Sequence, residues 1–487
     1  MAAFAFLIVV GNVPAFERIP RNLGSIFRVA VTSQRYDFFR PWDKRNPSSK
    51  EGLGILVRNN RILVTARLVA DATYIELEAP ATGEKVLGSV EAIDHLADLA
   101  VIKPEDSRFM WRLKPWRLQK KAKLDDQLKA IQFEGNGTPI FTDGEIKSIE
   151  VAGYPHGESS FLVYRVDISL AQTGSSFTVP FVKRGKLAGV LMEYSRNSRN
   201  AVLIPGVVID HFLTDLEDGH YDGFPRAGFE FSPLEDPQLR RFVGIDDNDS
   251  GVYITAVIPG SGADIDGLKP GDVLLAIDQY AIDKYGQYND KDFGRISLAH
   301  LTTTHAFAGN LRNFKILRDG QMSFLTVHMN HISLRDYPSA PFVIDEPPEY
   351  FIAGGLVFQE LSRQYLKEWG GNWASNAPRR LVYYDRHQWD LFEPGSRIVI
   401  LSQILPSGSN IGYEDLRYLP VTEVNGVKVR RLKDIPRALS IPIDGFHHIV
   451  FAENPKKIYL EATALEAENA VIKERFGLTN LLRFNDN

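Results

Sequence analysis

This chain of 487 residues contains 11 histidines and no cysteine. The groups with which it could do nucleophilic chemistry are therefore serine hydroxyls, histidine rings and carboxylates. The missing thiols exclude disulfides, thiolate metal ligands and a cysteine nucleophile. The first histidine in the chain is His95, so a catalytic arrangement that needs a histidine ahead of that position cannot be built. The adjacent His447 and His448 would point to opposite faces of a strand, which disfavours one metal site holding both. We therefore expect no metal and no cofactor.

The elements that position these groups come from a chain of ordinary globular composition, with 44% hydrophobic and 24% charged residues. At roughly 150 residues per domain, the length predicts about three domains. The formal net charge of −5 removes the general electrostatic case for nucleic acid or anionic lipid, although local basic patches remain open. No later run approaches the ~20 apolar residues of a membrane-spanning helix.

The first residues indicate export. The apolar run Ala2–Val10 is too short to span a bilayer, and Val13-Pro14-Ala15 offers small residues for signal-peptidase cleavage. The basic residues that usually precede such a run are missing. We expect an exported, periplasmic or envelope-associated protein, and the alternative is a cytoplasmic protein with a buried N-terminal segment.

Short β-rich segments follow one another from about residue 25 to residue 203 and predict an all-β barrel or sandwich. The first convincing helix is expected after Pro205, where apolar residues recur at helical spacing until Asp218-Gly219 ends the pattern. From Glu466 onward, the sequence predicts a helix with a polar tail.

Two later blocks resemble diverged copies of one domain. Val252–Pro259, a Gly/Ser turn and Val273–Asp278 recur as Ile398–Pro406, another Gly/Ser turn and Val421–Gly426, at an offset of roughly 150 residues. Between them, Tyr337–Glu349 is rich in proline and acidic residues, which is typical of a linker.

The first copy resembles a PDZ domain of the bacterial protease-associated kind. Two glycine-rich turns, at residues 260–263 and 267–272, lie between its strands, and Pro270-Gly271 suits the centre of a type II turn. In such domains a peptide adds as a strand beside a loop that holds its C-terminal carboxylate. The resemblance places that loop and the following strand at Ala227, Gly228, Phe229, Glu230 and Phe231.

The alternative is that these five residues are only a strand and its entry turn. The second copy lacks the Gly-Leu-Lys-Pro-Gly-Asp turn, so we expect an interaction or packing role there rather than peptide binding.

A β-barrel region followed by PDZ repeats is the layout of the HtrA/Deg serine proteases, and this resemblance covers nearly the whole chain. Residues 62–70 (ILVTARLVA) resemble the family segment ILTNAHVVA, residues 98–101 (DLAV) resemble DLAL, and residues 173–176 (TGSS) resemble the PGNS of PGNSGGP. Residues 347–358 and 410–415 resemble the long plant Deg proteases more closely than the short bacterial ones.

The resemblance implies a mainly β fold, in which a chymotrypsin-like double β-barrel is followed by two PDZ-like α+β domains. We expect a signal or N-terminal segment at residues 1–20 and a trypsin-like (pseudo)protease domain at residues 21–220. A first PDZ domain is expected at residues 221–335, and a PDZ-like domain with a C-terminal helix at residues 336–487. Family members assemble as trimers or larger rings, so a homo-oligomer, as a trimer or a multiple of three, is also implied.

Arg67 stands where the family has its catalytic histidine, while Asp98 and Ser176 occupy the other two triad positions. A guanidinium stays protonated and has no acceptor, so Arg67 cannot take the proton from a serine hydroxyl. His95 and His156 are poor substitutes because of their places in the chain. A buried carboxylate needs a partner, so we expect an ion pair between Arg67 and Asp98; the alternative is that Arg67 points to solvent.

The serine loop is also altered. Gly174 and Ser175 precede the serine at the oxyanion-loop positions, but Phe177 and Thr178 replace the two glycines that follow it. Glycine serves where the backbone needs a special φ or a close approach, so these replacements make the same loop conformation costly. Losing the base lowers the rate by roughly 10⁴ to 10⁶, and displacing an oxyanion donor lowers it by about 10² to 10³ more.

The leading hypothesis is a catalytically inactive homologue that binds peptides, or unfolded or partner proteins, through its PDZ domains, in a scaffold, regulatory or chaperone-like role. The alternative is an active serine endopeptidase of protein quality control that uses Ser176 with a non-standard base. A third hypothesis is a purely structural role in an envelope or surface assembly.

Overall fold

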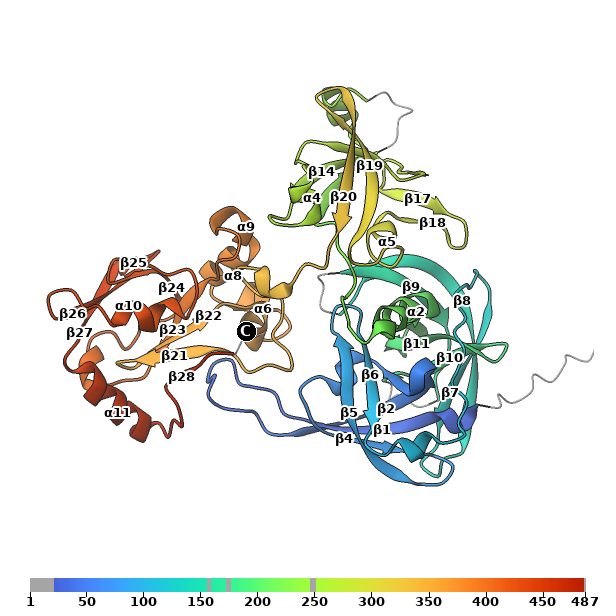
Figure 1. Ribbon diagram of the computed structural model, residues 1–487, viewed down its shortest axis with the longest axis horizontal. Coiled ribbons are helices and arrows are strands. Elements are labelled where there is room, and N and C mark those ends of the chain that lie inside the picture. The colour runs from blue at the N-terminus through green and yellow to red at the C-terminus, as the bar shows by residue number, and fades with distance from the viewer. Residues whose placement is uncertain (1–21, 156–158, 172–176, 246–250, 486–487) are drawn as a thin grey trace, which may run out of the picture.

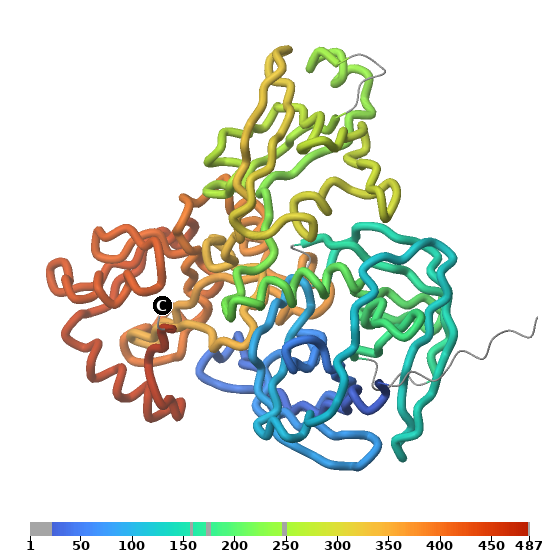
Figure 2. Tube along the Cα trace, turned by 45° about the vertical axis from the view of Figure 1, so that its right-hand side comes forward, coloured from blue at the N-terminus to red at the C-terminus, as the bar shows by residue number. Residues whose placement is uncertain are grey.

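The computed structural model describes residues 22–155, 159–171, 177–245 and 251–485. The fold is mainly β, with two closed six-stranded barrels followed by two further large sheets (Figure 1). Figure 2 shows the first of these sheets over the second barrel, and the other beside the first barrel. The expected fold class, a chymotrypsin-like double barrel followed by PDZ-like units, is confirmed.

The first barrel is a sheet closed on itself, so none of its strands is left with an unpaired edge. In its first strand Phe27, Val29 and Val31 point inward at two-residue spacing. The strands pair in the order β1-β2-β3-β6-β5-β4, and a short helix, α1 (Ala66–Val69), lies between β3 and β4. The strand bounds are β1 (Ile26–Ser33), β2 (Ser48–Val57), β3 (Arg61–Val64), β4 (Ala72–Glu78), β5 (Lys85–Asp94) and β6 (Leu99–Pro104).

The second barrel pairs in the order β10-β11-β12-β9-β8-β7. The helix predicted after Pro205 is α2 (Gly206–Asp215), whose apolar stripe is fully buried, and Gly219 ends the helical segment with a φ of +90°. The strands are β7 (Gln127–Phe133), β8 (Pro139–Gly153), β9 (Ser160–Asp167), β10 (Pro180–Lys183), β11 (Lys186–Ser195) and β12 (Asn200–Pro205).

The first PDZ-like unit is a sheet in the order β13-β14-β15-β19-β20, with β16 beside β15. Pro270-Gly271 forms the predicted turn, since Gly271 has a φ of +98° and the Asp272 N–H donates to the Lys269 carbonyl at 3.2 Å. The elements are β13 (Phe229–Pro233), α3 (Pro237–Phe242), β14 (Val252–Val257), α4 (Gly262–Ile265), β15 (Val273–Ile277), β16 (Tyr280–Ala281), β17 (Gln287–Asp290), β18 (Gly294–Ser297), α5 (Ala299–Thr302), β19 (Asn310–Arg318) and β20 (Gln321–Met329).

The second PDZ-like unit is a sheet in the order β27-β26-β24-β23-β22-β21-β28, with β25 beside β24. Its strands are β21 (Tyr350–Ala353), β22 (Leu356–Glu360), β23 (Val399–Ile404), β24 (Leu419–Val424), β25 (Val427–Lys428), β26 (Phe446–Phe451), β27 (Lys457–Glu461) and β28 (Leu482–Arg483). Four helices stand between β22 and β23 and two follow later: α6 (Arg363–Leu366), α7 (Trp373–Asn376), α8 (Arg379–Arg386), α9 (Gln388–Leu391), α10 (Asp434–Leu439) and α11 (Leu465–Arg475). The predicted internal repeat corresponds to β14 and β15 in one sheet and to β23 and β24 in the other.

The chain end corrects one expectation. The C-terminal helix is present as α11, but the residues after it are not a free polar tail, because β28 pairs with β21. Leu478 and Leu481 pack with Tyr350 in one apolar cluster, and this burial holds the end of the chain on the sheet. No helix within the described ranges is long and apolar enough to cross a bilayer, and the predicted segment of residues 1–20 lies outside those ranges.

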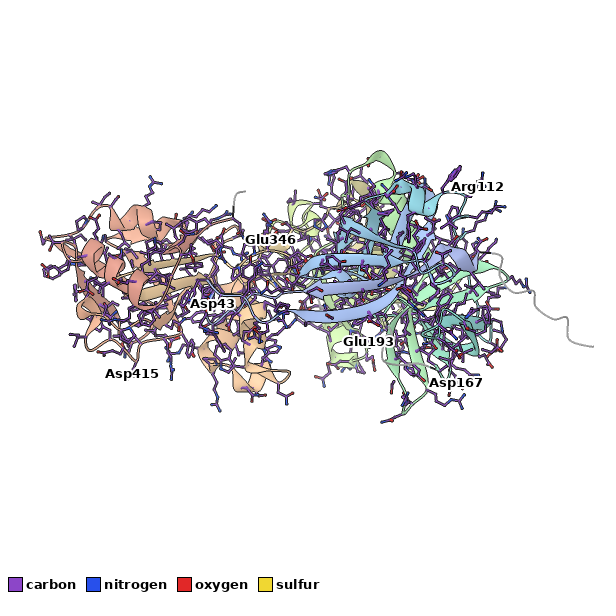
Figure 3. The ribbon with its side chains drawn as sticks, turned by 90° about the horizontal axis from the view of Figure 1, so that it is seen from below. Asp43, Arg112, Asp167, Glu193, Glu346 and Asp415 are labelled. Carbon is purple, nitrogen blue, oxygen red and sulfur yellow. The ribbon has the colours of Figure 1, made fainter. Side chains whose placement is uncertain are left out.

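A long connection between β1 and β2, residues 34–47, extends from the first barrel to the second PDZ-like unit, and we call it the arm (Figures 1 and 3). Phe38 is only 5% exposed, within an apolar cluster of the second unit. The Phe39 ring lies edge-on to Trp369, with centroids 4.7 Å apart. Trp42 packs in the same way on Tyr350, at 6.1 Å. In Figure 3, Asp43 of the arm lies toward the lobe that carries Asp415.

The junction between the second barrel and the first PDZ-like unit encloses a histidine. The His211 ring, from α2, stacks between Phe224 and Phe307 with centroid distances of 4.3 and 4.0 Å, and its Nδ1 lies 3.0 Å from the Thr304 carbonyl. Burial lowers the pKa of His211 to about 4, and likewise that of His300 in α5 to about 4. Both rings are therefore neutral in the folded protein at pH 7.

Removing the arm's main anchor tests its role. Phe38→Ala should cost about 3–5 kcal/mol of unfolding free energy, because it empties a buried aromatic site between two units. We expect faster cleavage of the arm in limited trypsin digestion and a lower first thermal transition. Arg40→Ala is the matched control, since that side chain is 62% exposed. Equal digestion rates for the two variants would contradict the anchoring role.

The buried histidines predict a pH dependence. An unfolded histidine has a pKa near 6.5, so the unfolded chain binds protons that folded His211 does not, and stability falls as pH drops from about 6.5 toward 4. Between pH 7 and pH 5, His211 should cost about 1–2 kcal/mol. His211→Phe should reduce this slope in denaturant titrations, while the exposed His220→Phe should leave it unchanged. An unaltered slope in His211→Phe would show that the junction opens before the ring titrates.

Candidate functional site

Arg67 and Asp98 meet at the position of the expected triad. The Arg67 N–H, at the start of α1, donates to Asp98 Oδ1 at 2.9 Å, and Arg67 Nε donates to Asp98 Oδ2, also at 2.9 Å. A third bond runs from Arg67 Nη2 to the Met192 carbonyl in the second barrel. The expected ion pair is therefore present, and it joins the two barrels.

The electrostatics of the pair follow from its burial. Asp98 is fully buried, whereas the Arg67 side chain is 28% exposed. Burial raises the pKa of the Asp98 carboxyl, and the Arg67 charge and its two hydrogen bonds oppose that rise. Every group that Arg67 presents here is a donor, so this pair stabilises a carboxylate but gives no acceptor for a hydroxyl proton.

Thr178, which is bonded to Thr65 two residues before Arg67, keeps a backbone conformation that favours glycine. Its φ is +57°, and the residue is completely buried. Its Oγ1 accepts the Thr65 N–H at 2.9 Å and lies 3.0 Å from Thr65 Oγ1. A β-branched residue in this region costs of order 1–3 kcal/mol, and these hydrogen bonds oppose that cost.

The neighbouring residue, Phe177, is bonded to strand β2 through its main chain. Its carbonyl accepts the Leu53 N–H at 3.1 Å. A Cβ added at Gly52 would lie 2.8 Å from Phe177 Cβ, so Gly52 gives this side chain its room. Ser176, Gly174 and Ser175 lie outside the described residues, as does His156.

His95 faces the linker between the PDZ-like units. Its Nε2 lies 2.7 Å from Asp345 Oδ2, and its ring packs edge-on to Phe342 with centroids 5.7 Å apart. Asp345 is also bonded to Asp71, whose Oδ1 accepts the Asp345 N–H at 3.1 Å. Lys50 Nζ donates to the Arg67 carbonyl at 2.9 Å, and the charges of Asp71 and Asp345 act on the same ammonium group, so the triad region lies near the contact between His95 and the linker. Nothing in the sequence indicated these contacts, because the partners are far apart along the chain.

The five residues predicted for peptide binding gather at one groove. Ala227, Gly228, Phe229, Glu230 and Phe231 line a cavity of about 220 Å³ whose other walls include Ile258, Leu298, Ala299, Thr302, Ser159 and Ser160. Strand β13 is at the end of its sheet, with β14 on one side only. A free edge beside a groove with side-chain pockets is what strand addition by a peptide requires. Sequence reasoning missed the two serines, which come from the second barrel.

Gly228 sets the shape of the loop ahead of β13. It has a φ of +86°, and a Cβ there would lie 2.1 Å from Ser261 Cβ. Its carbonyl accepts the Ile258 N–H at 2.8 Å, which ties the loop to the end of β14. Only glycine fits this close approach.

The second PDZ-like unit differs at the same edge. Strand β22 corresponds to β13, because each pairs with the first strand of the repeat, β23 or β14. On its other side, however, β22 pairs with β21, and β28 follows. The edge that is open in the first unit is therefore covered by the chain itself in the second.

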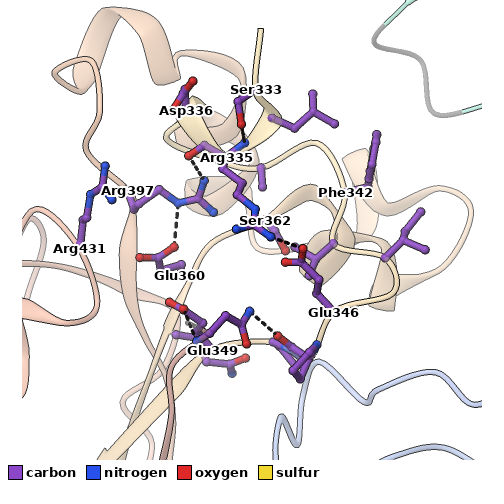
Figure 4. Close-up of a pocket in the computed structure, with 18 of the residues that line it drawn as sticks. Ser333, Arg335, Asp336, Phe342, Glu346, Glu349, Glu360, Ser362, Arg397 and Arg431 are labelled. Atoms are coloured by element: carbon purple, nitrogen blue, oxygen red, sulfur yellow. Dashed lines mark hydrogen bonds and ion pairs between the residues drawn. The ribbon is translucent and has the colours of Figure 1, made fainter. Parts of the chain in front are cut away.

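A larger cavity, of about 670 Å³, lies where the linker meets the second unit (Figure 4). Several of its charged side chains are already paired. Arg397 Nε donates to Glu360 at 2.7 Å, Arg335 pairs with Glu346, and Glu349 accepts the Asn485 N–H at 2.7 Å. These contacts fix the linker to the sheet. Within the described ranges, no three His, Asp or Glu side chains gather as a metal site.

Known proteins resemble this chain in sequence and in structure. Models of the PDZ domain match residues 228–288 and 341–481. "Protease Do-like 2, chloroplastic" of Arabidopsis thaliana is 28% identical over 463 residues, which cover 94% of this chain and 74% of that protein. "Protease Do-like 4, mitochondrial" of the same plant is 26% identical over 420 residues, covering 85% and 76%. The solved structure "HtrA-type protease AlgW with decapeptide" has a TM-score of 0.49 and 17% identity, over 64% of this chain and 97% of that one.

The ion pair predicts an asymmetric response to mutation. Arg67→Ala leaves a buried carboxylate without its cation and should cost about 3–5 kcal/mol of unfolding free energy, measured by denaturant titration. The double variant Arg67→Ala/Asp98→Ala should recover part of that loss, because no charge then stays buried alone. Lys85→Ala, from an exposed pair with Glu76, is the control and should cost less than about 1 kcal/mol. A double variant less stable than the single one would refute this assignment.

Proposed function

This chain is a homologue of the HtrA/Deg proteases, with a chymotrypsin-like double barrel and two PDZ domains, and we propose that it binds peptides or partner proteins without cleaving them. One observation carries the proposal. The position of the catalytic base is held by Arg67, whose N–H groups are bonded to Asp98 and to a main-chain carbonyl.

The chemistry of acyl transfer explains why that observation matters. A serine hydroxyl attacks a peptide carbonyl only when a base within hydrogen-bond reach takes its proton. Arginine stays protonated in proteins and has no lone pair to offer. In this arrangement Asp98 neutralises a cation, whereas in a working triad it would orient an imidazole.

The binding half of the proposal rests on the first PDZ domain. Its groove combines an open strand edge, a glycine-shaped loop and a wall that is apolar at Ile258, Leu298 and Ala299. In the second PDZ domain the corresponding edge is covered by β21. We therefore assign ligand binding to the first domain and a packing role to the second. A scaffold, regulatory or chaperone-like role follows from binding without cleavage.

An active serine endopeptidase of protein quality control is the second candidate. Two observations favour it: the relatives named above are called proteases, and Ser176 keeps its place in the sequence. It would need a base other than Arg67. Assembly as a trimer or a multiple of three, and export, stay predictions.

Two measurements on the full chain separate these candidates. We expect no cleavage of unfolded casein and no labelling of Ser176 by a fluorophosphonate probe, because a rate loss of roughly 10⁴ or more leaves no detectable turnover. Arg67→His is the companion variant. If it labels, the altered loop still supports chemistry and only the base is missing; if it does not, the loop is disabling too.

Casein cleavage by the wild type that disappears in Ser176→Ala would overturn the proposal in favour of the endopeptidase. Cleavage that persists in Ser176→Ala indicates a contaminating protease, and the preparation is then repurified until Ser176→Ala is silent before the wild type is judged.

A further inference from the structure

The open edge of β13 presents two different faces. Phe229 and Phe231 turn toward the domain core, where the Phe229 ring lies 5.8 Å from Phe314 and 6.5 Å from Phe231. Glu230 stands between them and is exposed. Since successive side chains of a strand alternate between its faces, Glu230 projects from the outward face.

Charge is sparse along this groove. Among its described lining residues the charged side chains are Arg226 and Glu230. Arg226 immediately precedes the loop at Ala227, and its Nη1 donates to the Tyr337 hydroxyl at 2.8 Å. The Glu230 carboxylate has no hydrogen-bond or ion-pair partner among the residues that the structure describes. The groove therefore has a cationic end at the loop and an unneutralised anionic group farther along the strand.

The position of the loop fixes the direction of a bound peptide. The loop lies at the N-terminal end of β13, so a peptide whose carboxylate is held there runs antiparallel to the strand. Its last side chain then enters the apolar walls made by Ile258, Leu298 and Ala299. The side chain before it faces outward, next to Glu230, because cross-strand neighbours share a face.

On the basis of the proposed peptide binding, we propose that the first PDZ domain selects peptides with an apolar C-terminal residue preceded by lysine or arginine, and that Glu230 is the residue that selects this cation. Opposite charges on neighbouring strands contribute about 0.2–1 kcal/mol, which corresponds to an affinity gain of up to about fivefold. Glutamate at the same peptide position meets a like charge and binds more weakly.

The test uses the full chain and hexapeptides that differ only in the residue before the last one. Labelled peptides ending in Lys-Val, Ala-Val or Glu-Val, with matched sets ending in Leu and Phe, are titrated by fluorescence polarisation. The wild type should bind the lysine peptides about two- to fivefold more tightly than the alanine peptides, and the glutamate peptides least tightly. The preference should shrink at high salt, since the pair is exposed.

Three variants isolate the side chain. Glu230→Gln should flatten the series, and Glu230→Lys should invert it. Glu235→Lys makes the same charge change at an exposed position outside the groove and should leave the order unchanged. Ala299→Trp fills the groove and should abolish binding of every peptide, with Met322→Trp on exposed β20 as its control.

The outcomes distinguish peptide binding by the first PDZ domain from the selectivity assigned to Glu230. If no peptide binds, the proposed peptide binding is wrong and this specificity is wrong with it. If peptides bind and Ala299→Trp blocks them, but lysine and glutamate peptides bind alike or Glu230→Lys leaves the order unchanged, the binding function stands and the role of Glu230 is refuted.

Discussion

A carboxylate that is wholly removed from water must be compensated, and the organisation of the barrel pair depends on how this is done at Asp98. Arg67 supplies both a main-chain N–H and a guanidinium N–H to the carboxylate, and then continues to the Met192 carbonyl in the other barrel. One side chain thus neutralises a buried charge and joins two barrels. Burying the two charges costs desolvation free energy. Removing either partner costs more, because it leaves the other charge buried without compensation. This geometry also leaves no lone pair where a base would stand.

The two PDZ domains differ in how the edges of their sheets are covered. Both contain the same strand neighbours, β14 beside β15 and β23 beside β24. In the first domain, β13 ends the sheet and leaves main-chain groups for a further strand, whereas in the second, β21 takes the corresponding groups of β22, and β28 pairs with β21 in turn. An unpaired edge is a template for any extended segment, so a chain that covers one edge and leaves another open restricts where a peptide can add.

Several contacts hold these parts in a fixed relation. The arm inserts Phe38 and Phe39 into the second PDZ domain, the linker bonds to the first barrel through Asp345, and His211 is enclosed between aromatic rings under the first PDZ domain. The paired charges around the large cavity, such as Arg397 with Glu360, brace the linker further. The groove of the first domain includes Ser159 and Ser160 of the second barrel, so its shape depends on that relation.

Local patterns were enough for the β-rich barrel region, for the helix after Pro205 and for the Pro270-Gly271 turn, because periodicity and turn chemistry are readable in the sequence. The double barrel with PDZ-like units, and the pairing of Arg67 with Asp98, were expected from the resemblance to the HtrA/Deg family together with the need of a buried charge for a partner. The resemblance to a known motif also placed Gly228 and its neighbours in one loop and strand, and the structure brings them together at one groove. The sequence could not reveal the arm's contact with Trp369, the docking of His95 on Asp345, or the strand that covers the edge of β22, and it misjudged the end of the chain as a polar tail. Those features join residues hundreds of positions apart, and only packing in three dimensions decides which distant surfaces exclude water from one another.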